Sequence, residues 1–306
     1  MNFHYPLLID GGLSTEMENM GYDLNHKLWT ARFIESDPFA LQKVHTAYLQ
    51  AGAGCISTFS YQATIPGYIN LGYTENEARQ FIIESVNIAR RAITEYMLDN
   101  PGQDRPLLAA SIGPYGAYLA DGSEYKGNYG TSDRELIDFH LKKRKILDNS
   151  GADILAFETI PSFQEAKIIA ELLIGVQTPS WVSFSCKDDH RINDGTSITQ
   201  CATLFADHPR VFAIGVNCTS PSYISQLIKN IRSSCGGKKV LAYPNSGEIY
   251  DPDTKTWKGL KEPGVLTSMT EQWIKEGLDM VGGCCRIGAN DIHKMSEVVK
   301  RAGKGS

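Results

Sequence analysis

Three cysteines carry the clearest chemical signal in this sequence, because two of them are adjacent and each follows a short apolar run. Cys284 and Cys285 stand two glycines after the run Met280–Val281, and Cys218 stands one residue after the run Val211–Val216. If both runs are parallel strands, their carboxyl ends bring three sulfur atoms together. Three thiolates suit zinc and leave a fourth position open, as in catalytic zinc sites. The spacing therefore predicts a catalytic metal site.

Such a site would activate an incoming thiol. A free thiol has a pKa of about 8.5 and is mostly protonated at neutral pH, whereas coordination to a metal removes its proton. The predicted nucleophile is therefore a sulfur atom of the substrate. The same residues leave an alternative open, in which Cys284 and Cys285 form a disulfide in a thiol redox or metal-sequestering protein and Cys218 is incidental.

Two carboxylates are predicted to share an edge of the fold with the cysteines. Asp10 follows the apolar run Leu7–Ile9, and Glu158 follows the run Ile154–Phe157. Carboxylates at these positions could receive the ammonium group of an amino-acid substrate. General acid–base catalysis is the competing role, and a helix cap or an ion pair is the structural alternative.

A tyrosine-rich segment at residues 113–130 could cover the same edge. It contains several glycines, Asp121 and four tyrosines, which are Tyr115, Tyr118, Tyr125 and Tyr129. A long loop in a compact domain is often a mobile lid. Tyrosine faces attract cations by about 0.5–2 kcal/mol, so the segment could bind a sulfonium methyl donor, with Asp121 adding negative charge. The alternative is that the tyrosines only pack the loop against the fold.

The composition is that of a globular protein with reduced thiols. The chain has 306 residues, of which 42% are hydrophobic, and a formal net charge of −5. It has no basic stripe and no long apolar segment, so we expect neither nucleic acid nor membrane as a partner, and we expect a cytoplasmic protein. Seven cysteines, an odd number, argue against a disulfide framework. Four cysteines lack clustering and are expected to be ordinary buried or surface residues: Cys55, Cys186, Cys201 and Cys235.

Short apolar runs alternate with amphipathic stretches eight times along the chain. The predicted strands are Leu7–Ile9, Cys55–Phe59, Leu107–Ile112, Ile154–Phe157, Trp181–Phe184, Val211–Val216, Val240–Tyr243 and Met280–Val281. The predicted helices are Phe39–Gln50, Glu75–Met97, Arg134–Asn149, Phe163–Ile174, Thr199–Ala206, Ser222–Ile231, Met269–Glu276 and Asp291–Arg301. This alternation predicts an α/β protein, a (β/α)8 TIM barrel built as a single domain over residues 1–306.

A barrel of this kind places its chemistry at the carboxyl ends of the strands and on the loops that follow them. The unusual residues of this chain fall at those ends. Asp10 follows the first predicted strand, Glu158 the fourth, Cys218 the sixth and Cys284 the eighth. The sequence therefore predicts that they share one rim. Four glycines beside them are expected to let the backbone approach a ligand closely: Gly11, Gly12, Gly282 and Gly283.

Four motifs at the predicted strand ends are Asp10-Gly11-Gly12, Glu158-Thr159, Gly215-Val216-Asn217-Cys218 and Gly282-Gly283-Cys284-Cys285-Arg286. With these motifs the chain resembles the homocysteine S-methyltransferase family, from about Leu7 to about Arg301. Three further segments are similar to the branch of that family that uses S-methylmethionine: Ser60-Tyr61-Gln62-Ala63-Thr64, residues 113–122 and Tyr243-Pro244-Asn245-Ser246-Gly247-Glu248.

The resemblance implies a barrel with Zn2+ as cofactor that methylates homocysteine to methionine. It implies Cys218, Cys284 and Cys285 as the catalytic zinc ligands. The expected substrate contacts are Asp10, Thr58, Glu158 and Asn217 for the amino acid, with Tyr115 and Asp121 on the covering segment. S-methylmethionine is the expected donor and S-adenosylmethionine the alternative. Selenohomocysteine or selenocysteine could replace homocysteine as the acceptor.

Overall fold

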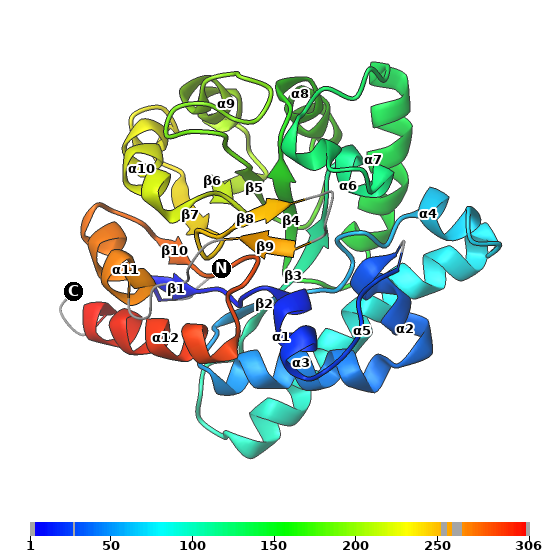
Figure 1. Ribbon diagram of the computed structural model, residues 1–306, viewed down its shortest axis with the longest axis horizontal. Coiled ribbons are helices and arrows are strands. Elements are labelled where there is room, and N and C mark those ends of the chain that lie inside the picture. The colour runs from blue at the N-terminus through cyan, green and yellow to red at the C-terminus, as the bar shows by residue number, and fades with distance from the viewer. Residues whose placement is uncertain (1–3, 27, 252–255, 259–264, 304–306) are drawn as a thin grey trace.

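Eight parallel strands form the barrel that the sequence predicts, as the computed structural model shows (Figure 1). The strands are β1 (Leu7–Leu8), β2 (Cys55–Ser57), β3 (Leu107–Ile112), β4 (Ile154–Ile160), β5 (Ser180–Phe184), β6 (Val211–Asn217), β7 (Lys239–Tyr243) and β10 (Met280–Val281). Hydrogen-bonded neighbours follow the order β1-β10-β7-β6-β5-β4-β3-β2, and a parallel bridge between Ile9 and Cys55 joins the two ends. The structure describes residues 4–26, 28–251, 256–258 and 265–303.

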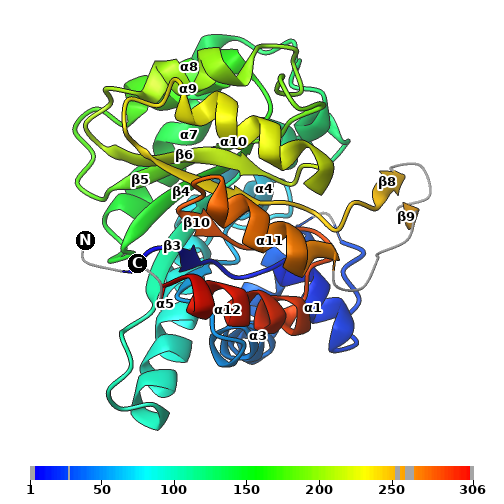
Figure 2. The same ribbon diagram turned by 90° about the vertical axis from the view of Figure 1, so that its left-hand side faces the viewer.

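Helices surround the barrel, and the eight predicted ones are all present (Figures 1 and 2). They are α3 (Pro38–Gln50), α5 (Glu75–Asp99), α7 (Asp133–Asp148), α8 (Phe163–Leu172), α9 (Ile198–Phe205), α10 (Ile224–Arg232), α11 (Val265–Lys275) and α12 (Ala289–Gly303). Five of them begin at a side-chain cap, which is Asp37, Thr74, Ser132, Ser162 or Ser197. Within the described ranges, none combines the length and the apolar character that crossing a membrane requires.

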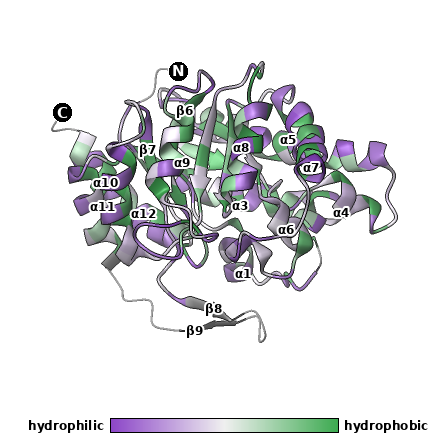
Figure 3. Cartoon of the chain, turned by 90° about the horizontal axis from the view of Figure 1, so that it is seen from above, coloured by the Kyte–Doolittle hydropathy of each residue, from purple (hydrophilic) through white to green (hydrophobic). Residues whose placement is uncertain are grey.

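Shorter elements in the connections are not predicted by the sequence pattern, because they are too brief to show a helical or strand period. They are α1 (Leu13–Asn19), η1 (Trp29–Arg32), α2 (Phe33–Ser36), α4 (Ile65–Ile69), α6 (Tyr115–Leu119), η2 (Ser123–Tyr125), η3 (Pro221–Tyr223) and the strands β8 (Ile249–Asp251) and β9 (Thr256–Lys258). The antiparallel hairpin β8–β9 lies between β7 and α11, and Figures 2 and 3 show it projecting from the body of the barrel.

Side chains of the strands alternate between the inside and the outside of the barrel. The inner set is mainly apolar and consists of Leu7, Ile9, Cys55, Ala109, Ile154, Ala156, Trp181, Ala213, Leu241, Tyr243 and Met280. Trp181 is fully buried, and the small alanines around it leave room for its ring. The outward residues, such as Ile56 and Val182, pack under the helices in a second core. The strands are accordingly mostly green in the hydropathy view (Figure 3).

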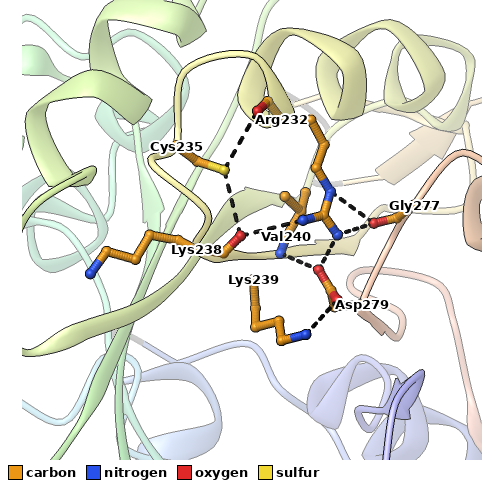
Figure 4. Close-up of polar contacts among 7 residues, drawn as sticks. All are labelled: Arg232, Cys235, Lys238, Lys239, Val240, Gly277 and Asp279. Carbon is orange, nitrogen blue, oxygen red and sulfur yellow. Dashed lines mark hydrogen bonds and ion pairs between the residues drawn. The ribbon is translucent and has the colours of Figure 1, made fainter.

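Asp279 ties together the amino ends of β7 and β10. Its carboxylate accepts hydrogen bonds from Val240 N at 2.8 Å, from Lys239 Nζ at 3.1 Å and from the Arg232 guanidinium. Figure 4 shows these groups converging on the carboxylate. Because Asp279 precedes β10 and Cys284 follows it, this network lies at the end of the barrel opposite to the predicted metal site. That end of a TIM barrel usually contributes to stability rather than catalysis.

Replacing Asp279 with alanine should destabilise the barrel and leave its metal content unchanged. The Val240 amide loses its acceptor, whereas the Arg232 guanidinium keeps those of Gly277 and Lys238. An unsatisfied buried donor costs about 1–3 kcal/mol. Urea denaturation should show a loss of that size in the free energy of unfolding. The matched control is Asp104→Ala, which removes a carboxylate whose side chain is 92% exposed and should change stability by less than about 0.5 kcal/mol. Equal stabilities of the two variants would contradict the assignment.

His45 is a buried, neutral histidine of α3. Among the described residues, neither ring nitrogen has a hydrogen-bond partner. The ring packs edge-on against Phe59, with the ring centroids 5.0 Å apart. Burial lowers the pKa of His45 from 6.5 to about 3. The folded protein therefore excludes a proton that the unfolded chain accepts in mild acid.

The free energy of unfolding should fall between pH 7 and pH 5 partly because of His45. Below its ordinary pKa of about 6.5 the unfolded chain binds this proton and the folded chain does not, so acid favours unfolding. One such group accounts for about 2 kcal/mol of the loss between pH 7 and pH 5. The variant His45→Phe keeps an aromatic ring and should lose that much less stability over the same interval. Urea denaturation of both proteins at the two pH values measures the difference, and parallel pH dependences would refute the explanation.

Candidate metal centre and substrate site

The three predicted cysteines meet at the carboxyl rim of the barrel. Cys218 follows β6, while Cys284 and Cys285 follow β10, and only β7 separates these two strands in the sheet. The three sulfur atoms all lie within 4.8 Å of one another, and the sulfurs of Cys218 and Cys285 are 3.6 Å apart. The remaining four cysteines are free and buried, as the sequence predicts: Cys55, Cys186, Cys201 and Cys235.

The sulfur cluster fits a zinc ion. Sulfur ligands lie about 2.3 Å from tetrahedral zinc, which places them about 3.8 Å from one another. The 3.6 Å between Cys218 Sγ and Cys285 Sγ is close to that value, and all three sulfur atoms lie within 4.8 Å of one another. Among the histidines, cysteines and acidic residues that the structure describes, the group contains these three ligands and no fourth. Three protein ligands with one open position are characteristic of catalytic rather than structural zinc.

The backbone leaves the strand conformation at the cysteines. Cys218 has a φ of 50° and Arg286 a φ of 67°, in the left-handed region that residues other than glycine rarely adopt. Asn217 belongs to the inward-facing positions of β6, so regular alternation would turn the next side chain toward the helices. The left-handed turn breaks this alternation and keeps Cys218 at the rim. Backbone strain of this kind concentrates at functional sites.

The segment after β7 braces both cysteine-bearing segments. The amide of Cys284 donates to the carbonyl of Pro244 at 2.8 Å, and the amide of Cys218 donates to the carbonyl of Tyr243 at 3.2 Å. Backbone hydrogen bonds thus connect the ends of β6, β7 and β10. The spacing of the sulfur atoms is therefore set by the backbone as well as by the side-chain rotamers.

The glycines beside the cysteines allow close packing within the protein, and their expected approach to a ligand remains a prediction. A Cβ added to Gly11 would lie 2.4 Å from the Ile287 carbonyl oxygen. A Cβ added to Gly12 would lie 2.5 Å from the Cys284 carbonyl oxygen. In Gly282-Gly283, a Cβ on the second residue would lie 2.2 Å from the Ile287 side chain. These glycines allow the ends of β1 and β10 to pack closely.

The cluster favours negative charge on one sulfur. Hydrogen bonds from Cys284 and then from Cys285 lower the pKa of Cys218 well below its usual range. The hydrogen bond to Cys218 raises the pKa of Cys284, and the same partner raises that of Cys285. A thiolate at Cys218 is therefore stabilised by two neighbouring S–H donors. Such a centre attracts a cation, as a metal site requires.

Inside the barrel, a layer of polar side chains lies at the carboxyl end of the strands, next to the apolar inner side chains. It is formed by the next inward positions along the strands, which are Ser57, Ser111, Glu158, Ser183, Asn217 and Tyr243. Most of them follow an inward apolar residue of the same strand by two positions, as the period of a strand requires. All six are buried. The floor of the site is therefore polar and shielded from solvent.

Asp10 and Glu158, the two predicted carboxylates, face this layer. Asp10 accepts hydrogen bonds from the Ser57 amide at 2.7 Å and the Ser57 hydroxyl at 3.1 Å. Glu158 accepts one from the Tyr243 hydroxyl at 2.9 Å and one from the Ser111 hydroxyl. Burial raises the pKa of both carboxyl groups, and the nearby Glu158 raises that of Asp10 further. A cationic substrate group beside them would offset this cost.

A β-bulge in β4 begins directly after the inward-facing Glu158. The pairing of β4 with β5 shifts register between Phe157 and Ile160, and Thr159 has a φ of 63°. Asn217 satisfies the backbone group that the bulge frees, because its Oδ1 accepts from Thr159 N at 2.7 Å. Its Nδ2 also donates to Thr159 Oγ1 at 2.7 Å. Asn217 therefore stabilises the bulge, and its direct contact with substrate remains a prediction.

Thr58 holds the loop after β2 against β3. Its buried hydroxyl is 2.6 Å from Ser60 Oγ and accepts a hydrogen bond from Ser111 N at 3.0 Å. Lys143, a buried lysine of α7, holds the same loop by donating to the carbonyls of Ser60 and of Tyr61, the latter at 3.0 Å. Burial lowers the pKa of Lys143 to about 7. A contact between Thr58 and the amino acid remains a prediction.

The tyrosine-rich segment is folded rather than structureless, since it contains α6 and η2. The Tyr115 ring packs against Tyr129 at 5.6 Å and Phe139 at 5.2 Å between centroids. Asp121 is exposed and accepts a hydrogen bond from the Ser123 amide at 2.9 Å. The contacts of Tyr115 and Asp121 therefore stabilise the segment itself, and their contacts with substrate remain predictions.

Tyr125 is the tyrosine of this segment that reaches the sulfur cluster, with its hydroxyl 3.7 Å from Cys218 Sγ. The preceding residue, Glu124, is half-buried. Its Oε2 is shielded from solvent and has no hydrogen-bond partner within the part of the chain that the structure describes. Burial, with a further contribution from Cys218, raises the pKa of Glu124 to about 7.

The sequence motifs miss several groups of this site. Those on strands are Ser57, Ser111, Ser183 and Tyr243. Extending the period-two alternation of each strand to its carboxyl end would have found them. Glu124 lies in a turn, where no periodicity indicates the direction of a side chain, and only the structure places it beside the cysteines.

Known relatives match nearly the whole chain. A sequence profile of the homocysteine S-methyltransferase family matches residues 7–299. Homocysteine S-methyltransferase YbgG of Bacillus subtilis (strain 168) is 44% identical over 297 residues, covering 95% of this chain and 94% of that protein. Selenocysteine Se-methyltransferase of Brassica oleracea var. italica is 44% identical over 295 residues, covering 91% of this chain and 84% of that protein.

Crystal structures of the homocysteine methyltransferase MmuM from Escherichia coli share the fold. The metallated form has a TM-score of 0.86 and 36% sequence identity, with 95% of each chain covered. The apo form has a TM-score of 0.77 and 30% identity, also with 95% of each chain covered. The profile, the sequence relatives and the shared barrel agree with the resemblance carried by the strand-end motifs. This chain belongs to the homocysteine S-methyltransferase family of enzymes.

Proposed function

We propose that this protein transfers a methyl group from S-methylmethionine to homocysteine at a zinc centre, which yields two molecules of methionine. The observation that carries the proposal is the convergence of Cys218, Cys284 and Cys285 within 4.8 Å, with one ligand position open. Zinc, when bound there, supplies the Lewis acidity that keeps a thiol deprotonated at neutral pH. The family membership supports homocysteine as the source of that thiol.

The chain's own residues bind and orient the acceptor. The ammonium group of homocysteine is the cation that Asp10 and Glu158 are placed to receive, because both carboxylates are buried near each other. Each carboxylate oxygen accepts one hydrogen bond from the protein and keeps a further lone pair for a ligand. Ser57 holds the Asp10 carboxylate in position, and Ser111 and Tyr243 hold that of Glu158.

The transfer itself requires alignment rather than a general base. The acceptor thiolate uses an electron pair to form the new bond from sulfur to the methyl carbon. The old bond breaks, its electron pair returns to the donor sulfur, and the positive charge of the sulfonium disappears. The thiol proton has left before this step, so no histidine is needed at the reacting carbon. Positioning in a dry site supplies the rest of the rate enhancement.

One relative favours selenium as a second acceptor chemistry. The Brassica oleracea protein that is 44% identical to this chain is named a selenocysteine Se-methyltransferase. A selenol is more acidic than a thiol and forms an anion in the same position, so the three-sulfur centre is compatible with either element. Selenocysteine or selenohomocysteine is therefore the second candidate acceptor.

Each of the three site cysteines should be essential for metal binding. Changing Cys218, Cys284 or Cys285 to alanine removes one of three ligands, and zinc content should fall from about one ion per chain to a small fraction of that value. Methyl transfer should fall with it. The matched control is Cys235→Ala, a buried cysteine at the opposite end of the barrel, which should retain its zinc. Elemental analysis of the purified proteins measures the outcome, and a wild-type protein with reversible loss of two thiols and no zinc would indicate the redox alternative.

S-methylmethionine should be the faster donor. The zinc-loaded protein, supplied with homocysteine and a donor labelled in its methyl group, should form labelled methionine from S-methylmethionine more rapidly than from S-adenosylmethionine. Mass spectrometry of the product ranks the two donors directly. A higher rate with S-adenosylmethionine would reverse the donor assignment, and no transfer from either donor would refute homocysteine as the acceptor.

A further inference from the structure

One carboxylate oxygen beside the sulfur cluster has no partner among the described residues. Glu124 Oε2 is shielded from solvent and accepts no hydrogen bond there. Asp10 and Glu158 differ, because each of their oxygens accepts a hydrogen bond from the protein. A buried carboxylate oxygen without a hydrogen-bond partner costs free energy that a cationic ligand would offset. Glu124 therefore has the property expected of a group that binds a cation.

The backbone fixes Glu124 in place. Its carbonyl oxygen is 3.4 Å from both Ser185 Oγ and Asn193 Nδ2, which donate to it from the region after β5. Its amide packs against Gly116, where a Cβ would lie 2.5 Å from the Glu124 nitrogen. These contacts on both sides fix the backbone from which the side chain projects.

Glu165 of α8 anchors the segment that carries Glu124. The Tyr115 amide donates to its Oε1 at 2.7 Å, and the Tyr129 hydroxyl donates to its Oε2 at 2.8 Å. His140 Nε2 of α7 lies 2.7 Å from the same Oε1. The two tyrosines flank Glu124 on either side in the sequence, so the buried carboxylate of Glu165 holds both ends. This anchoring preorganises Glu124 for a ligand.

Glu124 lies next to the metal ligands without belonging to them. The hydroxyl of the adjacent Tyr125 is 3.7 Å from Cys218 Sγ. The set of ligand atoms that lie within 4.8 Å of one another contains the three sulfurs and does not include Glu124. The carboxylate is therefore placed for a substrate that approaches the metal centre from the side of the tyrosine-rich segment.

We propose that Glu124 binds the sulfonium group of the methyl donor. This inference rests on the proposed function and extends it to a donor subsite. In an in-line transfer the acceptor sulfur approaches the methyl carbon of the donor at about 3–3.5 Å. The donor sulfur is bonded to that methyl carbon on its far side, so it lies farther from the metal site than the methyl group does. A carboxylate at this position attracts the positive charge through a medium of low dielectric. The donor leaves as a neutral thioether, so the attraction ends when the methyl group has moved.

The variant Glu124→Gln tests the proposal because it keeps the shape of the side chain and removes its charge. The KM for S-methylmethionine should rise about 10- to 100-fold, while the KM for homocysteine and the zinc content stay at wild-type values. Glu124→Asp should recover part of the loss, since it restores the charge. The matched control is Glu171→Gln, an exposed carboxylate of α8, which should leave the KM for both substrates unchanged. An unchanged donor KM in Glu124→Gln, or loss of its zinc, would overturn the proposal.

A binding measurement separates the sulfonium from the rest of the donor. The probe is the carbon isostere of S-methylmethionine, in which a CH group replaces the charged sulfur. Calorimetry should show that the wild-type enzyme prefers S-methylmethionine to this isostere by about 10-fold or more, and that Glu124→Gln loses the preference. Equal weakening of both ligands would place the donor's ammonium group at Glu124 and overturn the sulfonium assignment. Failure of the proposed function is distinct, because it would appear as absence of methyl transfer in the wild-type enzyme.

Discussion

The requirement that three sulfur atoms share one small volume determines the rest of the rim. Hydrogen bonds from two thiols to the Cys218 sulfur help to hold the cluster together, and the backbone must bring the three segments to one place. It does so with a left-handed residue at Cys218, with hydrogen bonds from both cysteine segments to the end of β7, and with glycines that let β1 and β10 approach. The left-handed conformation of Cys218 opposes the local preference of its backbone. The large apolar interior and the helix layer supply the stability that offsets the cost of this conformation.

The same rim separates two kinds of carboxylate. Asp10 and Glu158 belong to the polar layer on the strands and are fixed by hydrogen bonds from serine and tyrosine side chains. Glu124 belongs to a connection and keeps an unpaired oxygen. The proposed two-substrate reaction would need two recognition sites that do not exchange their ligands. Placing one on rigid strands and the other on an anchored segment provides that distinction.

The sequence predicts the barrel well because its signals are periodic and repeated. Eight apolar runs and eight amphipathic stretches match the strands and principal helices, and strand-end position alone brings Cys218 and Cys284 to one rim. Short elements such as the β8–β9 hairpin are missed because three residues carry no period. The orientation of site groups is harder to predict, since the bulge at Thr159 and the turn at Glu124 arise from tertiary contacts. The glycines beside the cysteines pack closely against protein atoms, and their approach to a ligand remains a prediction.

Charge balance connects these observations to the class of methyl donor. If a divalent metal binds as proposed, three thiolates exceed its charge and the centre stays negative, and the carboxyl groups of Asp10, Glu124 and Glu158 belong to the same end of the barrel. Lys143 is the nearby buried cation, and burial lowers its pKa to about 7, so it offsets only part of this charge. A neutral or anionic donor would enter a negative site of low dielectric without compensation. A sulfonium donor brings positive charge to the site and gives it up as the methyl group leaves, so the product is held less tightly than the substrate.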